Sequence, residues 1–175
     1  MKPKRIFDIL VNQVEQNPIE KCLSMKINGI WEATSSQEFL DKANQITLAF
    51  IELGVKNQDK IALITSTNRT EWSIFDMGIL QFGGVTVPLY PTISSADYEY
   101  ILNHSESAYC VVSDEEIYNK VFSIKSKVKG LKDIYSFERI DGCNHWSELL
   151  SLGKKKFNKK KLEKVKSNVS PEDLA

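Results

Sequence analysis

The sequence has few cysteines and histidines and no long apolar run. Its three cysteines, Cys22, Cys110 and Cys143, are odd in number and form no CxxC motif. This argues against a disulfide framework or a zinc site and favours reduced thiols. No window approaches the ~18 apolar residues of a transmembrane helix, and the basic start at residues 1–5 is not followed by the apolar core of a signal peptide. We therefore expect a cytoplasmic protein, with any membrane contact peripheral to the inner membrane surface.

Loops that grip phosphates by themselves are also missing. Neither GxxxxGKS/T nor GxGxxG occurs in the sequence. Gly78 and Gly83 have the spacing of the first motif, but Gly84 stands where lysine is required. A tight turn between a helix and a strand is the better interpretation. The three tryptophans do not have the spacing of a nucleic-acid stacking platform, so no nucleic-acid partner is expected.

The histidines and the acidic cluster indicate structural roles. His104 is expected at the end of a helix, where its charge favours the helix dipole. His145 follows Cys143 closely, but neighbouring loop residues rarely face each other, so we expect it to be structural rather than part of a Cys-His pair. The carboxylates at residues 114–116 suit a helix N-terminus better than a metal site. No residue is therefore predicted to be catalytic or to bind a metal.

The formal net charge is zero, but the charge is unevenly distributed. Residues 154–166 hold eight lysines and one glutamate, a net +7, so the other residues together carry −7. Such a run can meet phosphates, RNA or an anionic membrane. A solvated helix or linker is the simpler interpretation, and we prefer it.

The hydrophobic pattern predicts an α/β fold with a parallel sheet and helical crossovers. An amphipathic helix opens the chain at Ile6, and Asn28–Gly29 between two short apolar runs predicts a β-hairpin. Pro88 cannot donate a hydrogen bond within a sheet, so its strand is expected to end or to lie at an edge. The strands are predicted at residues 60–65, 85–89, 108–112 and 133–137, and further helices at 36–53, 69–82, 94–103, 113–128 and 146–152. Thr67 and Asn68 are expected to cap the helix at 69–82.

The composition divides the chain after residue 153. Residues 1–153 are predicted to form a partial N-terminal α/β subdomain. Residues 154–175 are lysine-rich and polar, as in a connector. Ser170–Pro171–Glu172–Asp173 is a good helix start or turn, so we expect the natural chain to continue beyond Ala175.

Two stretches resemble motifs of a known enzyme superfamily. Residues 31–40, the helix after them, and Leu53–Gly54–Val55 through Asp59–Lys60–Ile61–Ala62–Leu63 are similar to the first core motif of acyl-activating enzymes, with its "x-G-V-x-x-G-D-x-V-A-I" pattern. Gln58 replaces the usual glycine, which alters a turn but no chemistry. Asn68–Arg69–Thr70–Glu71–Trp72 through Gly83–Gly84–Val85–Thr86–Val87–Pro88–Leu89–Tyr90–Pro91–Thr92 is similar to the second motif, in the form of the long-chain fatty acid–CoA ligases. The resemblance spans roughly residues 6–137.

The resemblance implies an N-terminal fragment of an AMP-forming long-chain fatty acid–CoA ligase. That family joins a fatty acid to the α-phosphate of ATP, releases pyrophosphate, and then transfers the acyl group to coenzyme A. Its Mg²⁺-bound phosphates are held by a Thr/Ser/Gly-rich loop that ends in lysine, which would be expected within a few residues after Ala175. The fragment is therefore expected to be inactive and to bind no cofactor alone, whereas ATP, Mg²⁺ and CoA serve the parent.

The turn at Tyr90, Pro91 and Thr92 is the candidate site of this segment. In related acetate ligases the aligned turn, Phe-Gly-Gly, lies near the adenine of CoA, so the resemblance implies that Tyr90 is a stacking surface. The alternative is that Tyr90 packs under the loop that follows it. Ligands of doubly wound sheets gather at the carboxyl ends of the strands, where this turn would lie.

Four other expectations concern function and partners. Another carboxylate-adenylating enzyme of the superfamily is the nearest alternative. A non-enzymatic α/β binding module with a basic tail is the alternative from a different class. If the chain is a ligase fragment, its partner is the remainder of the parent chain. Apolar surface that this remainder would cover is then exposed in the fragment, and we expect it to cause self-association.

Overall fold

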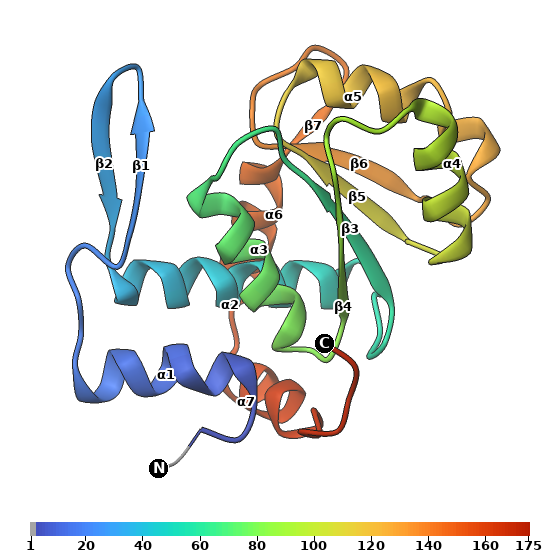
Figure 1. Ribbon diagram of the computed structural model, residues 1–175. Coiled ribbons are helices and arrows are strands. Elements are labelled where there is room, and N and C mark those ends of the chain that lie inside the picture. Colours follow the sequence, from blue (N-terminus) through green and yellow to red (C-terminus); the bar gives the residue numbers. More distant parts are fainter. Residues whose placement is uncertain (1–2) are drawn as a thin grey trace.

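A computed structural model describes residues 3–175 as an α/β fold with a separate hairpin (Figure 1). Five parallel strands form one sheet in the order β4-β3-β5-β6-β7. They are β3 (Lys60–Ile64), β4 (Val85–Leu89), β5 (Tyr109–Val112), β6 (Asp133–Ser136) and β7 (Asn144–His145). This confirms the predicted fold class. Pro88 lies in β4, at the edge of the sheet, as its missing N–H requires.

Helices cover both faces of the sheet. The helices of the described residues are α1 (Ile6–Gln16), α2 (Ser36–Glu52), α3 (Thr70–Leu80), α4 (Ser95–His104), α5 (Glu115–Phe122), α6 (Trp146–Lys155) and α7 (Lys159–Ser167). Alternate strand residues point to opposite faces. Ile61, Leu63 and Val111 enter the core under α2, α3 and α6, whereas Ala62 and Cys110 enter the core under α4 and α5. α1 and α7 pack on the outer side of α2 (Figure 1).

The hairpin stands apart from the sheet (Figure 1). Strands β1 (Leu23–Ile27) and β2 (Ile30–Thr34) pair antiparallel around Asn28 and Gly29. These two residues have φ of 49° and 83°, the positive values that the predicted two-residue hairpin turn requires. Three large apolar side chains of the hairpin are exposed, namely Ile27, Ile30 and Trp31. Self-association through such surface stays a prediction.

Some boundaries differ from those predicted. Thr67 and Asn68 do not cap α3, because the capping position is Arg69, whose side chain bonds to carboxylates instead. The helix predicted over 113–128 ends at Phe122 and is followed by a 3₁₀ turn at Lys125–Lys127. The strand β7 was missed, because two residues are too short to show a period.

The lysine-rich segment is folded. Lys154 and Lys155 end α6, and the next lysines run into α7, whose Leu162 is buried. Ser35 caps α2 through the backbone N–H of Glu38, and the Glu38 side chain pairs with Lys42. The division of the chain after residue 153 stays a prediction. Within residues 3–175, no helix has the length and apolar character needed to cross a bilayer.

Candidate active-site edge

The candidate site lies at the carboxyl edge of the sheet. The chain passes from β3 to the neighbouring β4, then crosses back over β3 to reach β5 on its other side. The connections therefore diverge between β3 and β5, whose last residues, Ile64 and Val112, are register partners. In open α/β sheets such a switch point opens a crevice for ligands. The loops that follow β3, β4, β5 and β6 all begin at this edge.

A hydroxyl–carboxylate cluster joins the loops after β3 and β5. The Ser66 hydroxyl donates to Asp114 Oδ2 at 2.7 Å, and the Ser113 hydroxyl donates to the same oxygen at 2.6 Å. The Ser66 backbone N–H donates to the Ser113 hydroxyl at 3.0 Å. Burial raises the pKa of Asp114, but the hydrogen bonds from the two serines and from the Ile117 backbone outweigh it, so that this pKa is lowered. Asp114 therefore stays ionised and caps α5.

Arg69 holds a second ionic cluster at the start of α3. Its guanidinium donates to Glu71 Oε1 at 3.0 Å and to Glu138 Oε1 at 3.1 Å. Burial would lower the pKa of Arg69, but the two carboxylates raise it overall. The ring of Phe137 lies 5.6 Å below the guanidinium. Arg69 is thus fixed between the loops after β3 and β6, with its charge already neutralised.

A shallow hollow of about 830 Å³ opens between these loops. Four carboxylates and two cations line it, namely Asp114, Glu115, Glu116, Glu138, Arg69 and Lys120. Both cations are paired with carboxylates, since Lys120 contacts Glu116 at 2.9 Å and Arg69 contacts Glu138. A net acidic hollow with no free cation among its described lining residues does not favour a phosphate group.

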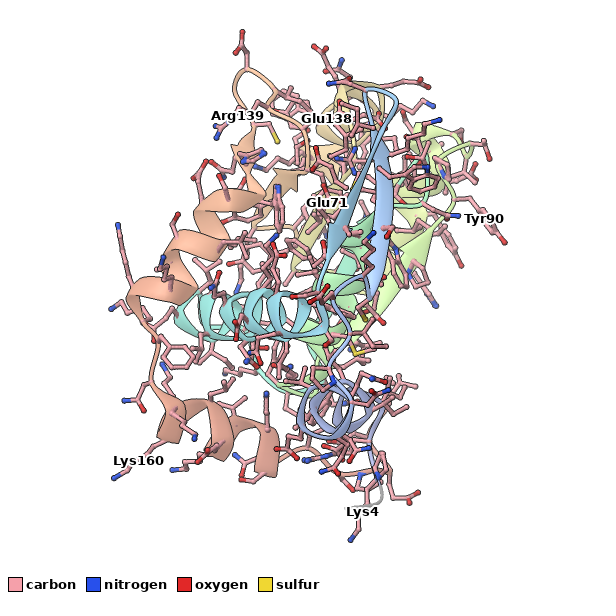
Figure 2. All side chains as sticks on the ribbon, turned by 90° about the vertical axis from the view of Figure 1, so that its left-hand side faces the viewer. Lys4, Glu71, Tyr90, Glu138, Arg139 and Lys160 are labelled. Atoms are coloured by element: carbon pink, nitrogen blue, oxygen red, sulfur yellow. The ribbon has the colours of Figure 1, made fainter. Side chains whose placement is uncertain are left out.

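The predicted turn after β4 forms one side of this edge. Pro91 and Thr92 line the hollow, whereas the side chain of Tyr90 points outward and is 79% exposed. Figure 2 shows Tyr90 at the side of the molecule, away from Glu71 and Glu138. The Tyr98 hydroxyl donates to the Tyr90 carbonyl at 2.9 Å. The turn is therefore anchored through its backbone, and in this structure the ring is exposed rather than packed under the loop that follows it.

The histidines take structural positions. His145 accepts the Ser147 N–H and caps α6, and its Nε2 lies 3.0 Å from the Phe137 carbonyl. The Cys143 thiol instead faces the carbonyls of Ile134 and Asn144, and burial raises its pKa to about 11, so it is a poor nucleophile. His104 ends α4 and stacks on Tyr100.

No group of three His, Cys, Asp or Glu side chains in residues 3–175 is arranged to hold a metal ion. Gly78 and Gly83, which have the spacing of a phosphate loop, do not form one. Gly78 lies inside α3 against Ile46, and Gly83 forms the turn into β4 with a φ of 74°.

Sequence reasoning missed both ionic clusters. Ser66, Arg69 and Asp114 each lie within five residues of the end of a predicted strand, so their position at one edge could have been anticipated from the parallel order. The pairing of Arg69 with Glu138 could not have been anticipated from the sequence, because 69 positions separate the two residues.

Comparisons with known proteins agree with this architecture. The family model described as "AMP-binding enzyme" matches residues 10–175. A long-chain-fatty-acid–CoA ligase, FadD15 of Mycobacterium bovis, is 30% identical over 108 residues, which cover 62% of this chain and 18% of the relative. The ligase ACSBG2 of Xenopus laevis is 24% identical over 83% of this chain and 21% of its own length. The chain thus spans about a fifth of the length of these relatives.

Solved structures share the fold. The anthranilate CoA ligase AuaEII superposes with a TM-score of 0.70 and 21% identity, covering 83% of this chain and 26% of that one. A fatty acyl CoA synthetase of Mycobacterium tuberculosis gives a TM-score of 0.67 and 18% identity over 85% of this chain and 28% of its own. At these identities the likeness concerns the fold alone.

Proposed function

Because this chain belongs to the family of AMP-binding enzymes, we propose that it forms the N-terminal α/β part of an AMP-forming long-chain fatty acid–CoA ligase. Such an enzyme converts a fatty acid, ATP and CoA into acyl-CoA, AMP and pyrophosphate. Two sequence observations support the substrate class. The stretch from Asn68 to Thr92 has the form of that branch, and relatives such as FadD15 carry this activity in their names.

In this proposal the chain supplies a scaffold rather than the reacting groups. Its sequence has no glycine-rich phosphate loop, and the cations of the hollow are paired. The remainder of a longer parent chain would bind ATP and Mg²⁺ and would complete the site above the carboxyl edge. The residues described here would hold that edge in shape through the clusters around Arg69 and Asp114.

Tyr90 is the residue of this chain that we assign to substrate contact. The exposed ring on an anchored turn is the observation that carries this assignment. An aromatic ring of this kind can stack on the adenine of CoA. The acidic hollow beside it would repel the CoA phosphates, so these are expected to extend away from Asp114 and Glu138.

Two other functions are alternatives to this proposal, and experiment separates them from it. Another carboxylate-adenylating enzyme would share this segment, because its fold is common to ligases of aromatic acids as well. A non-enzymatic module with a basic tail would need no downstream partner. Sequence beyond Ala175 separates the interpretations, since a ligase requires a Gly- and hydroxyl-rich loop that ends in lysine.

The decisive experiment compares the complete reading frame that contains these residues with the 175-residue chain. We expect the complete protein to catalyse ATP–pyrophosphate exchange with palmitate and to form the thioester when CoA is added. We expect no exchange with the isolated chain. Exchange by the isolated chain would contradict the scaffold role. A complete protein that activates benzoate but not palmitate would contradict the substrate class.

A further inference from the structure

The turn between α6 and α7 concentrates positive charge around one exposed aromatic ring. Its sequence is Lys-Lys-Lys-Phe-Asn-Lys-Lys-Lys, from Lys154 to Lys161. Phe157 is 56% exposed between the two lysine triplets. Lys160 and Lys164 lie one turn apart on the outer side of α7, opposite the buried Leu162. We call residues 154–164 the basic turn.

Some lysines of the basic turn hold it in place and others are free. Glu52 of α2 accepts ion pairs from Lys156, at 3.5 Å, and from Lys161. The Asn158 side chain accepts the Lys161 N–H and caps α7. By contrast, no ion pair in residues 3–175 involves Lys154, Lys155, Lys160 or Lys164. The fold therefore presents four uncompensated lysines on a fixed support.

The end of α7 is also tied to the body of the protein. The Arg5 guanidinium donates to the carbonyls of Lys166 and Val169. Lys166 donates to Asn44 of α2 at 2.7 Å. Figure 2 shows Lys4 and Lys160 at the same lower end of the molecule, opposite Glu138 and Arg139. The basic turn thus lies at the opposite end of the protein from Glu138, which lines the acidic hollow.

The chemistry of the basic turn fits a lipid surface better than RNA. Residues 154–166 contain eight lysines and no arginine, so they lack the planar forks that recognise individual phosphates. A single phenylalanine makes no stacking platform for successive bases. A bilayer interface, however, attracts lysines through its diffuse negative potential and takes up an apolar side chain beneath the headgroups. Lysine stems can extend along that interface while their charges stay in water.

We propose that the basic turn docks this protein on an anionic bilayer surface, with Lys154, Lys155, Lys160 and Lys164 over the headgroups and Phe157 inserted between them. Docking of this kind does not depend on the ligase activity. It would hold the protein peripherally with its carboxyl edge directed away from the lipid.

Co-sedimentation of the 175-residue chain with vesicles tests the docking. We expect binding to phosphatidylcholine vesicles that contain phosphatidylserine, no binding to phosphatidylcholine alone, and release at high salt. Replacing Lys160 and Lys164 by glutamine should weaken binding by about fivefold for each lysine. The matched control replaces Lys26 and Lys129 by glutamine. These two lysines are exposed, form no ion pair among the described residues and lie outside the basic turn. This control should leave binding unchanged.

A second pair of variants tests the aromatic ring. Phe157→Ser should weaken vesicle binding, whereas Phe122→Ser, which removes a ring of similar exposure (54%) on α5, should not. Thermal melts confirm that each variant is folded. Absence of binding to the anionic vesicles, or equal loss in the target and control variants, would overturn the proposal. Tight binding of single-stranded RNA that alone depends on Lys160 and Lys164 would replace the bilayer with a nucleic acid.

Discussion

Gly153 of α6 packs directly on the backbone carbonyl of Gln45 in α2. A Cβ atom at position 153 would lie far inside the contact distance of that oxygen and of the Gln45 Cα. The obstacle is backbone in the middle of a helix, so it cannot move aside as a flexible side chain could. This close approach lets α6 and α2 pack together over one face of the sheet.

We therefore expect Gly153→Ala to destabilise the protein by about 3 kcal/mol, because overpacking separates the helices and outweighs the better helix propensity of alanine. Chemical denaturation gives the change in the free energy of unfolding. Gly130→Ala is the matched control, since no atom lies within 4 Å of the added methyl group. It should be neutral or slightly stabilising. Equal effects of the two variants would show that the close approach at Gly153 is unimportant.

A second prediction concerns the ion pairs of Arg69. The side chains of Arg69 and Glu71 are only 14% and 10% exposed. Removing the cation leaves the Glu71 carboxylate buried without its partner, so Arg69→Met should cost about 3 kcal/mol of unfolding free energy. The double variant Arg69→Met/Glu71→Leu should recover most of this loss, because no unpaired charge remains.

Glu138 provides the contrast for that experiment. Its side chain is 53% exposed, so Glu138→Gln should cost under about 1 kcal/mol although it removes an ion pair of similar length. Denaturation curves of the four proteins, including the wild type, measure both effects. A double variant less stable than Arg69→Met would indicate that packing around Phe137, and not charge, determines the stability of this corner.

The parts of the fold that the sequence predicts are those set by short-range chemistry. Asn28–Gly29 determines its own turn, and Pro88 determines an edge position, because each acts through its own backbone. The beginning of α3 is different. Asn68 has a capping side chain, but Arg69 takes the cap position because distant Glu138 and nearby Glu71 hold its side chain.

The same distinction applies to the candidate edge. The resemblance located Tyr90, Pro91 and Thr92, and the alternating pattern placed them at the carboxyl ends of strands. The backbone of Tyr90 is held by a hydrogen bond from Tyr98, which lies on the next helix. The acidic character of the hollow depends on α5 and on the loop after β6. The sequence pattern of a single strand or helix does not reveal such contacts between separate elements.

Tyr90 gives a prediction for the complete enzyme. If its ring stacks on the adenine of CoA, Tyr90→Ala should raise the KM for CoA about tenfold. Exchange of pyrophosphate with fatty acid and ATP should be unchanged, because CoA takes no part in that step. Tyr90→Phe should retain a normal KM, since stacking needs only the ring.

Tyr100→Ala serves as the control for that experiment. Tyr100 is 68% exposed on α4 and stacks on His104, so its removal alters a comparable surface outside the hollow. Steady-state kinetics with CoA as the varied substrate separate the variants. An unchanged KM in Tyr90→Ala, or an equal rise in Tyr100→Ala, would remove Tyr90 from the CoA site.

The last prediction concerns the pH dependence of stability and rests on Lys166. Burial, together with the positive charge of Arg5, lowers the pKa of Lys166 from 10.5 to about 8. Below pH 8 the amine is charged in both the folded and the unfolded chain, so the cost of burying the charge is fully present. Between pH 8 and 10.5 the folded chain loses this proton before the unfolded chain does. The free energy of unfolding should therefore rise across this window through Lys166.

A comparison of two variants isolates this contribution. Burial raises the pKa of Cys143 to about 11 and that of Tyr98 to about 12, and these groups lower stability above their ordinary pKa values in every variant. The difference in unfolding free energy between the wild type and Lys166→Met cancels them. Because Lys166 is only partly buried, we expect this difference to rise by about 1–2 kcal/mol between pH 8 and 10.5. Lys164→Met, which removes an exposed lysine from the same helix, is the matched control for the loss of a lysine side chain. A flat difference for Lys166→Met would mean that the Lys166 amine is not held in a desolvated position beside Asn44.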